Sequence, residues 1–97
     1  MIVAIWHYRV AEGREAEFEA TYGAGGEWAE LFGKGSGYLG TELMRGEGGN
    51  YVTMDTWRDR AAFDTFKKKF AAEYDALDRK CEALTAEEQE LGFYEAV

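Results

Sequence analysis

The chain has little of what disulfide-bonded, metal-binding and membrane proteins need. Its 97 residues include no proline, one cysteine (Cys81) and one histidine (His7). A lone cysteine excludes an internal disulfide and a multi-cysteine zinc site, and a lone histidine excludes a histidine-rich metal site. No apolar run approaches the roughly 20 residues of a membrane-spanning helix, and no signal-peptide pattern opens the sequence. We therefore expect a cytoplasmic protein without a bound metal.

Positive charge is also scarce. Eleven Lys and Arg side chains stand against nineteen Asp and Glu side chains, which gives a formal net charge of −8. A polyanion repels the phosphate backbone of nucleic acids and the anionic surface of membranes. The composition therefore argues against a nucleic-acid partner and against a membrane partner.

Aromatic side chains, by contrast, are abundant. Three Trp, six Tyr and six Phe make up 15% of the chain, more than one small domain over residues 1–97 easily hides in its core. Some of them form a helical stripe with an ordinary packing role. Six others lie on predicted strands or beside a glycine-rich corner: Trp6, Tyr8, Tyr22, Trp28, Tyr51 and Trp57. We expect these six to be divided between a binding cavity and a subunit interface.

The pattern of apolar residues predicts the secondary structure. β-Branched and aromatic content predicts strands over residues 2–10, 38–45, 51–57 and 91–97. Helical periodicity predicts helices over residues 14–22, 27–32 and 59–84, the last as one long helix or two in sequence. Thr85 followed by Glu88 has the form of a capping box and predicts one more short helix.

The order strand, helix, strand, strand, helix, strand indicates the fold. It fits an α+β, ferredoxin-like βαββαβ domain, a four-stranded antiparallel sheet with its helices on one face. Alternation along the first strand places Trp6 and Tyr8 on one face and Ile5 and His7 on the other. Because helices cover only one face, we expect a second copy of the chain to cover the other in a two-fold homodimer.

Three segments resemble a known family. They are residues 1–18 with Gly13 before a Glu-Phe helix start, residues 37–43, and residues 51–63 with Trp57 before an Ala-Ala-Phe helix start. These segments are similar to the antibiotic biosynthesis monooxygenase family, also called dimeric α/β-barrel proteins. The resemblance implies a homodimer whose sheets pack face to face as a dimeric α/β barrel, with a pocket between sheet and helices in each subunit.

The resemblance also implies chemistry. Some members oxidise phenolic or quinol polyketide intermediates with molecular oxygen and no cofactor, and others bind and degrade haem. Trp57 matches a tryptophan that faces the pocket in quinone-forming members, although a packing role at the strand end is the alternative. Those members carry a tyrosine where this chain has Phe63 and an asparagine where it has Thr53. Haem degraders place a histidine where this chain has residues 74–76, which contain none.

His7 is the side chain that titrates near neutral pH without help, and it would suit a base that removes a phenolic proton. Asp55 on the neighbouring third strand would orient it if both face the same side of the sheet. The alternative for His7 is packing at the dimer interface or exposure at the strand end. We therefore predict His7, Asp55 and Trp57 as catalytic residues.

Four further aromatic residues are predicted to contact substrate: Trp6, Tyr22, Trp28 and Phe63. The predicted function is a cofactor-independent monooxygenase, without a bound cofactor, that oxidises a small aromatic or polyketide-type molecule. The alternative is a non-catalytic module that binds a small molecule or haem. Cys81 lies on an apolar helical stripe and is expected to be an inert core thiol.

Overall fold

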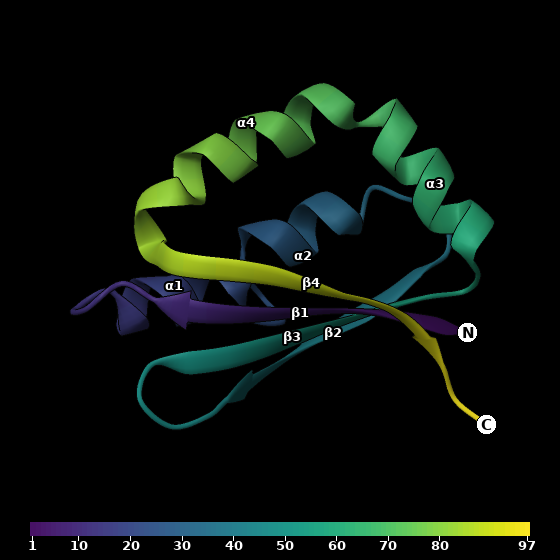
Figure 1. Cartoon of the computed structure of the whole chain (residues 1–97). Helices are drawn as coiled ribbons and strands as arrows, with labels where there is room; N and C mark the ends of the chain where they lie inside the picture. Colours follow the sequence, from purple (N-terminus) through teal and green to yellow (C-terminus); the bar gives the residue numbers. More distant parts are fainter.

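The computed structural model describes all residues, 1–97, as four strands and four α-helices joined by short connections (Figure 1). In chain order the elements are β1 (Ile2–Val10), α1 (Glu15–Tyr22), α2 (Glu27–Phe32), β2 (Tyr38–Arg45), β3 (Asn50–Trp57), α3 (Arg60–Lys69), α4 (Ala71–Cys81), a 3₁₀ turn (Glu82–Leu84) and β4 (Thr85–Glu95). Apart from the last segment, these bounds agree with the sequence-based ones to within about one residue, and the predicted long helix is two helices in sequence.

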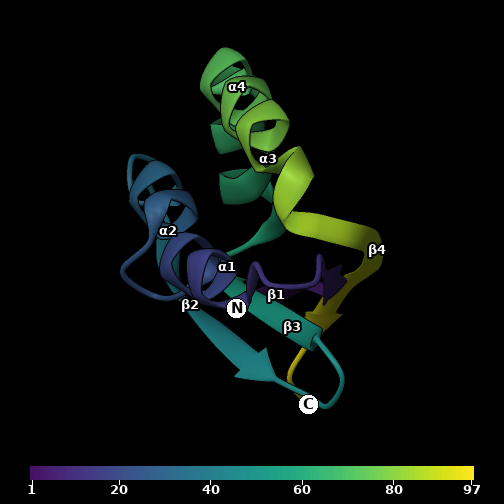
Figure 2. The same cartoon turned by 90° about the vertical axis from the view of Figure 1, so that its left-hand side faces the viewer.

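The strands form one antiparallel sheet in the order β2-β3-β1-β4. All helices lie on one side of it, as Figure 2 shows. This is the α+β, ferredoxin-like arrangement that the sequence predicts. The sheet of the single chain is open and does not close into a barrel.

Strict alternation along β3 separates the two faces of the sheet. Tyr51, Thr53, Asp55 and Trp57 are buried beneath the helices, and the residues between them are only partly buried. The other side, which we call the open face, carries Val3, Ile5 and His7 of β1 and Val52 and Met54 of β3. The register places two polar residues, Thr53 and Asp55, on the buried face.

An aromatic cluster holds the helices on the sheet. Trp57, Phe18 and Phe66 have almost no exposed surface, and the Trp57 ring centroid lies 5.2 Å from that of Phe66 and 5.8 Å from that of Phe32. Burial of each such side chain stabilises the fold by roughly 1.5–3 kcal/mol. The helical stripe of the sequence is thus core, as expected.

The segment over residues 59–84 forms an arch above the sheet (Figure 1). It begins at Asp59, whose side chain accepts a hydrogen bond of 2.8 Å from the Ala62 backbone N–H and caps α3. The helix ends at Phe70 (φ −111°, ψ 28°), and α4 continues from there in a new direction. The break separates α3 from α4, and each of the two helices contributes walls to the cavity described below.

The prediction of a helix after Thr85 was wrong. Thr85 and Glu88 do interact, but through their side chains (Oγ1 to Oε1, 3.1 Å), and no backbone N–H is capped. Residues 85–95 instead form one long strand that pairs with β1 from Val10 back to Ile2. Strand pairing over this length outweighs a local capping signal, because the helix would leave one side of β1 unpaired.

A bulge in β4 changes the side of the sheet on which its last side chains lie. The register with β1 shifts between Ile5 and Trp6, and Gly92 in the bulge has φ 110°, a conformation that favours glycine. The extra residue turns Phe93 to the helix side, where its ring packs edge-on against Phe63 at 5.0 Å. Without the bulge Phe93 would face the open side and the cavity would lose an end wall.

The expected division of six aromatic residues is also corrected. All six belong to the helix side of the sheet, either in the core or packed against it: Trp6, Tyr8, Tyr22, Trp28, Tyr51 and Trp57. The open face instead exposes Leu39, Met44 and Tyr94. These six aromatic residues therefore serve the core and the cavity, whereas the open face combines aliphatic side chains with polar ones such as His7, Glu42 and Gln89.

Candidate functional site

A cavity lies between the buried face of the sheet and the arch of α3 and α4. Its outer chamber has a volume of about 540 Å³, within the size range of small-molecule sites. An inner recess of about 40 Å³ continues from it toward α1 and α2. Trp6, Phe32, Asp55 and Tyr74 line both parts, so we treat the chamber and the recess as one site.

Aromatic rings make most of the wall of the inner recess. They come from β1, α1, α2 and α4 and are Trp6, Tyr8, Tyr22, Trp28, Phe32 and Tyr74. Neighbouring rings touch, with centroid distances of 5.1 Å between Tyr8 and Tyr22 and 5.0 Å between Trp28 and Tyr74. Such a wall favours a flat apolar ligand that stacks on the rings or meets their edges.

Asp55 is the most buried carboxylate of the chain, with 7% of its surface exposed. It accepts a hydrogen bond of 2.6 Å from the Thr41 hydroxyl, which in turn is 2.5 Å from the Tyr38 hydroxyl. Because Thr41 donates to Asp55, Tyr38 is the donor to Thr41. Burial raises the pKa of Asp55 to about 6, and the Thr41 hydrogen bond partly opposes that rise. A carboxylate with this pKa is ionised at neutral pH yet basic enough to accept a proton.

Two buried polar atoms of residues that line the recess have no partner within hydrogen-bond distance. They are Oγ1 of Thr53, whose residue is 3% exposed, and Nε1 of Trp28, whose residue is 7% exposed. Both residues line the inner recess. Leaving such groups unpaired costs about 1–3 kcal/mol each, so a bound molecule with an oxygen atom in the recess would satisfy them.

The tyrosines of the recess are neutral hydroxyl groups. Burial raises the pKa of Tyr8 and of Tyr22 far above the ordinary value. Burial, followed by the Asp78 and Asp55 carboxylates, raises the pKa of Tyr74 to about 12. None of the three is therefore a proton acceptor at neutral pH, and Asp55 is the buried base that the recess offers.

The four residues predicted to contact substrate all line the cavity. Trp6, Tyr22 and Trp28 form walls of the inner recess, and Trp6 also borders the outer chamber. Phe63 lines the outer chamber from α3. Their contact with a substrate stays a prediction, but the structure brings them together around one space.

His7 and Asp55 lie on opposite faces of the sheet. His7 pairs with Val52 of β3 and Gln89 of β4 and belongs to the open face, whereas Asp55 pairs with Ala4 and is buried under the helices. The condition for an orienting contact, a shared face, is not met. His7 accordingly has no access to the cavity, and the open face is where either of its alternatives, packing at a dimer interface or exposure at the strand end, would place it.

Trp57 does not line the cavity either. Its side chain is fully buried among Phe32, Tyr38, Phe63 and Phe66. This environment is the one expected from the alternative role of Trp57, packing at the end of the strand.

Sequence reasoning missed several polar residues of the site. Thr53 lies two positions before Asp55 on the same buried face, and the polar character of both on an aromatic face was the available signal. Asp78 on α4 and Glu88 on β4 also line the recess. Glu88 was hidden by the mistaken helix after Thr85.

Comparisons with known proteins agree with this geometry. The family model described as antibiotic biosynthesis monooxygenase matches residues 1–74. The chain belongs to the antibiotic biosynthesis monooxygenase family. No curated protein sequence matches this family member significantly.

Solved structures share its fold at low sequence identity. SnoaB, a cofactor-independent oxygenase from Streptomyces nogalater, is 24% identical with a TM-score of 0.72, over 99% of this chain and 92% of that one. A mutant of MhuD with two manganese protoporphyrin IX molecules per active site is 22% identical with a TM-score of 0.75, over 100% and 95%. An uncharacterised NIPSNAP domain protein from Burkholderia xenovorans is 17% identical with a TM-score of 0.72, over 100% and 95%. These likenesses establish the fold that this family member shares.

No group of three or more His, Cys, Asp or Glu side chains is arranged to hold a metal ion. No helix is both long enough and apolar enough to cross a membrane. The cytoplasmic location expected from the sequence stays a prediction.

Proposed function

We propose that this chain is a cofactor-independent monooxygenase that oxidises a small, electron-rich phenol or quinol with molecular oxygen. The observation that carries the proposal is Asp55, a buried carboxylate with a raised pKa of about 6 in an aromatic cavity. Perturbed carboxylates in such places are typical of catalytic bases. Membership of a monooxygenase family supports the same reaction class.

The reaction begins with proton transfer. Asp55 removes the phenolic proton, and the resulting anion is electron-rich enough to reduce dioxygen by one electron. The two radicals combine into a peroxide at a ring carbon that carries hydrogen, and this peroxide eliminates water to leave a carbonyl. One oxygen atom of dioxygen enters the product and the other leaves as water with the phenolic and the ring hydrogen, so a ring C–H of the phenol (the CH₂ of its keto tautomer) becomes C=O.

The rest of the cavity positions the substrate. The Thr53 hydroxyl and the Trp28 N–H would hydrogen-bond the substrate oxygen next to Asp55 and satisfy two atoms that otherwise have no partner. Trp6 and Tyr22 would hold the ring by stacking in the recess. Phe63 would cover the part of the ligand in the outer chamber. A dry aromatic wall also strengthens the electrostatic effect of Asp55.

Oxygen uptake tests the proposal directly. We expect the purified protein to consume one dioxygen per quinone formed with at least one member of a panel of anthrones and naphthols, measured with an oxygen electrode and by product absorbance. A protein that binds members of the panel but consumes no oxygen above the blank would refute the activity and leave a binding module.

Haem, one of the ligands that the alternative function allows, does not fit the residues of this cavity. The chamber and recess contain no histidine, and Tyr74 is a neutral phenol there. Haem carries two propionates, whereas six carboxylates line the outer chamber against two basic side chains. A haem titration in the same assay should therefore give no sharp Soret shift.

We also propose that two copies of the chain associate through the open face. Ile5 and Met54 lie at its centre as a cross-strand pair, and Leu39, Met44 and Tyr94 are each more than half exposed. Large exposed apolar side chains on one sheet face are typical of a subunit interface. A partner there would also explain why the face that carries His7 has no helix over it.

Replacing Ile5 by Asp should separate the copies. Ile5 belongs to the open face, so a charge there opposes association without entering the helix-side core. Light scattering should give a mass of about 22 kDa for the wild type, twice the 11.0 kDa of the chain, and 11.0 kDa for Ile5→Asp. Ala72→Asp, at an exposed position of α4, is the control and should remain dimeric. A wild-type mass of one chain at micromolar concentration would overturn the interface.

A further inference from the structure

The cavity is strongly anionic. Six carboxylates line the outer chamber, and the only basic side chains there are Arg60 and Lys67. The inner recess has three carboxylates, Asp55, Asp78 and Glu88, and no basic side chain. Of the cavity carboxylates only Asp64 forms an ion pair, with Arg60 at 3.1 Å. The other five cavity carboxylates form no ion pair, although Lys67 lines the same chamber.

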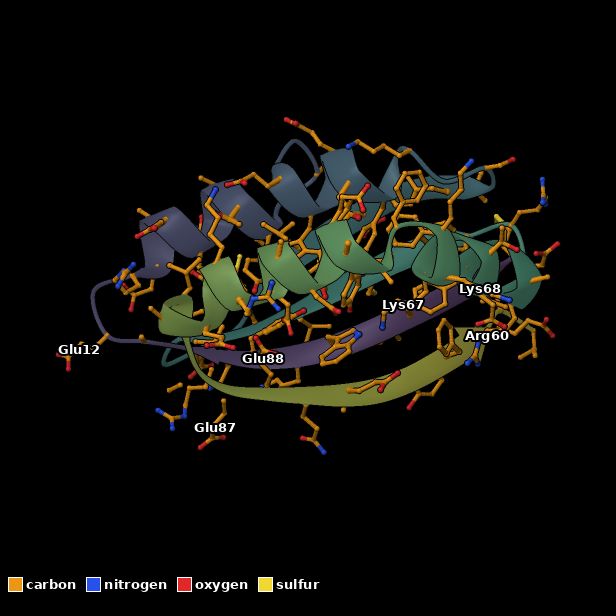
Figure 3. The ribbon with its side chains drawn as sticks, turned by 90° about the horizontal axis from the view of Figure 1, so that it is seen from above. Glu12, Arg60, Lys67, Lys68, Glu87 and Glu88 are labelled. Carbon is orange, nitrogen blue, oxygen red and sulfur yellow. The ribbon has the colours of Figure 1, made fainter.

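Four of these carboxylates influence the same side chain, Tyr74. Asp78, Asp55, Glu88 and Glu90, from α4, β3 and β4, all contribute, after burial, to the raised pKa of Tyr74, and all four line the outer chamber with it. Figure 3 shows Glu88 toward one end of the molecule and Lys67 and Arg60 toward the other. In this view Glu88 thus lies apart from the two basic side chains of the cavity.

The aromatic wall is of the kind that attracts cations. The ring faces of Trp and Tyr carry negative potential, and cages of such rings recognise ammonium groups. The chain already shows one example, because the Lys67 Nζ lies 4.0 Å from the centroid of the Tyr74 ring. A second example is the Arg60 guanidinium, whose Cζ lies 4.0 Å from the centroid of the Phe93 ring.

An independent observation indicates that a ligand belongs here. The Thr53 hydroxyl is buried, lines the recess and has no hydrogen-bond partner, and the same holds for the Trp28 N–H. These atoms call for an oxygen or another polar atom of a bound molecule at the bottom of the recess. They do not depend on the charge of the carboxylates around the mouth.

We propose that the cavity takes an aromatic molecule with a positively charged nitrogen, its hydroxyl group in the recess and its ammonium group between Tyr74, Asp78 and Glu88. The inference rests on the proposed function for the choice of site and names the substrate class, a phenol that carries an amine. Attraction by unpaired carboxylates and by ring faces acts in the same direction. An anionic ligand would meet repulsion from both.

Three phenols of similar size test the charge preference. They are 3-hydroxyphenyltrimethylammonium, its neutral isostere 3-tert-butylphenol, and 3-hydroxybenzoate. Calorimetry at pH 7 under nitrogen should show the ammonium compound binding about ten-fold tighter than the neutral one, and 3-hydroxybenzoate more weakly than both. Equal or tighter binding of 3-tert-butylphenol or of 3-hydroxybenzoate would overturn the proposal.

Two pairs of variants locate the effect. Glu88→Gln should weaken ammonium binding three- to ten-fold and leave 3-tert-butylphenol unchanged, whereas Glu12→Gln, the same charge change in the exposed β1–α1 turn, should change neither.

Lys67→Gln should strengthen ammonium binding because it removes a competing cation from Tyr74, and Lys68→Gln, outside the cavity lining, should not. Equal effects of Glu88→Gln and Glu12→Gln, or weaker binding in Lys67→Gln, would count against the site.

The binding assay is separate from the oxygen assay. It contains no oxygen, so a tight ammonium complex together with no oxygen uptake would reject the monooxygenase and retain the cationic ligand. Oxygen uptake with neutral phenols, together with no preference for the ammonium compound, would do the reverse.

Discussion

Replacing Asp55 by Asn should lower kcat/KM for oxygen-dependent turnover by at least about 100-fold, because the loss of a general base typically costs 10²–10⁴-fold. Asn has the same shape and its oxygen still accepts the Thr41 hydroxyl, so the cavity keeps its form. The measurement is initial oxygen uptake with the best phenol of the panel. Glu12→Gln, which removes an exposed carboxylate, should retain full activity.

The pH profile identifies the same group. Turnover requires ionised Asp55, so kcat/KM should rise with pH through about 6, the raised pKa of that carboxyl. Other ionisable groups near Asp55 come from β1 (Tyr8), α4 (Tyr74, Asp78) and β4 (Glu88). The tyrosines stay neutral in this range, and the negative charges would only raise the pKa of Asp55 further.

Substitutions of Thr41 test the role of Asp55 through the pH profile, which a purely structural role of Thr41 would not move. Its hydrogen bond lowers the pKa of Asp55, so Thr41→Val should move the acid limb to higher pH, whereas Thr41→Ser should leave it in place. If Asp55→Asn keeps more than half of the wild-type rate, or if the acid limb of the pH profile does not move in Thr41→Val, another group is the base.

The fold was largely predictable because its signals are local and repeated. Alternation over residues 2–10 and 51–57 and the helical stripe from Phe63 to Leu84 agree with one architecture. The exception is the segment from Thr85, where a three-residue capping signal predicts a helix. Its actual partner, β1, is more than seventy residues away in the sequence, and only that pairing makes it a strand.

The site was less predictable because it depends on register. Alternation alone leaves open which residues of β1 share a face with Asp55. In the antiparallel pairing of β1 with β3, Asp55 lies opposite Ala4 and His7 lies opposite Val52, so the two side chains face apart. The condition on which the pairing of His7 with Asp55 was predicted, a shared face, is therefore not met. Asp55 acquires a suitable pKa only from burial, which the sequence does not display.

The burial that makes Asp55 a base also lowers the stability of the fold at neutral pH. Its pKa is about 6 when folded and 3.8 as an ordinary aspartate, so the folded state binds the proton more tightly. Stability from this group is fully present below pH 3.8 and is lost as pH rises through 6. The ionised form is therefore disfavoured at neutral pH by about 3 kcal/mol, from 1.36 kcal/mol per pKa unit.

Asp55→Asn should accordingly be more stable than the wild type at neutral pH and nearly equal to it at pH 4. Urea unfolding at both pH values should show the difference in the free energy of unfolding growing by about 2 kcal/mol between them. Asp59→Asn provides the opposite sign, because the Ala62 N–H lowers the pKa of the Asp59 carboxyl and its contribution is lost on acidification. A pH-independent difference for Asp55→Asn would mean that the carboxylate is solvated in the folded state, and a solvated carboxylate is too weak a base for the proposed proton transfer.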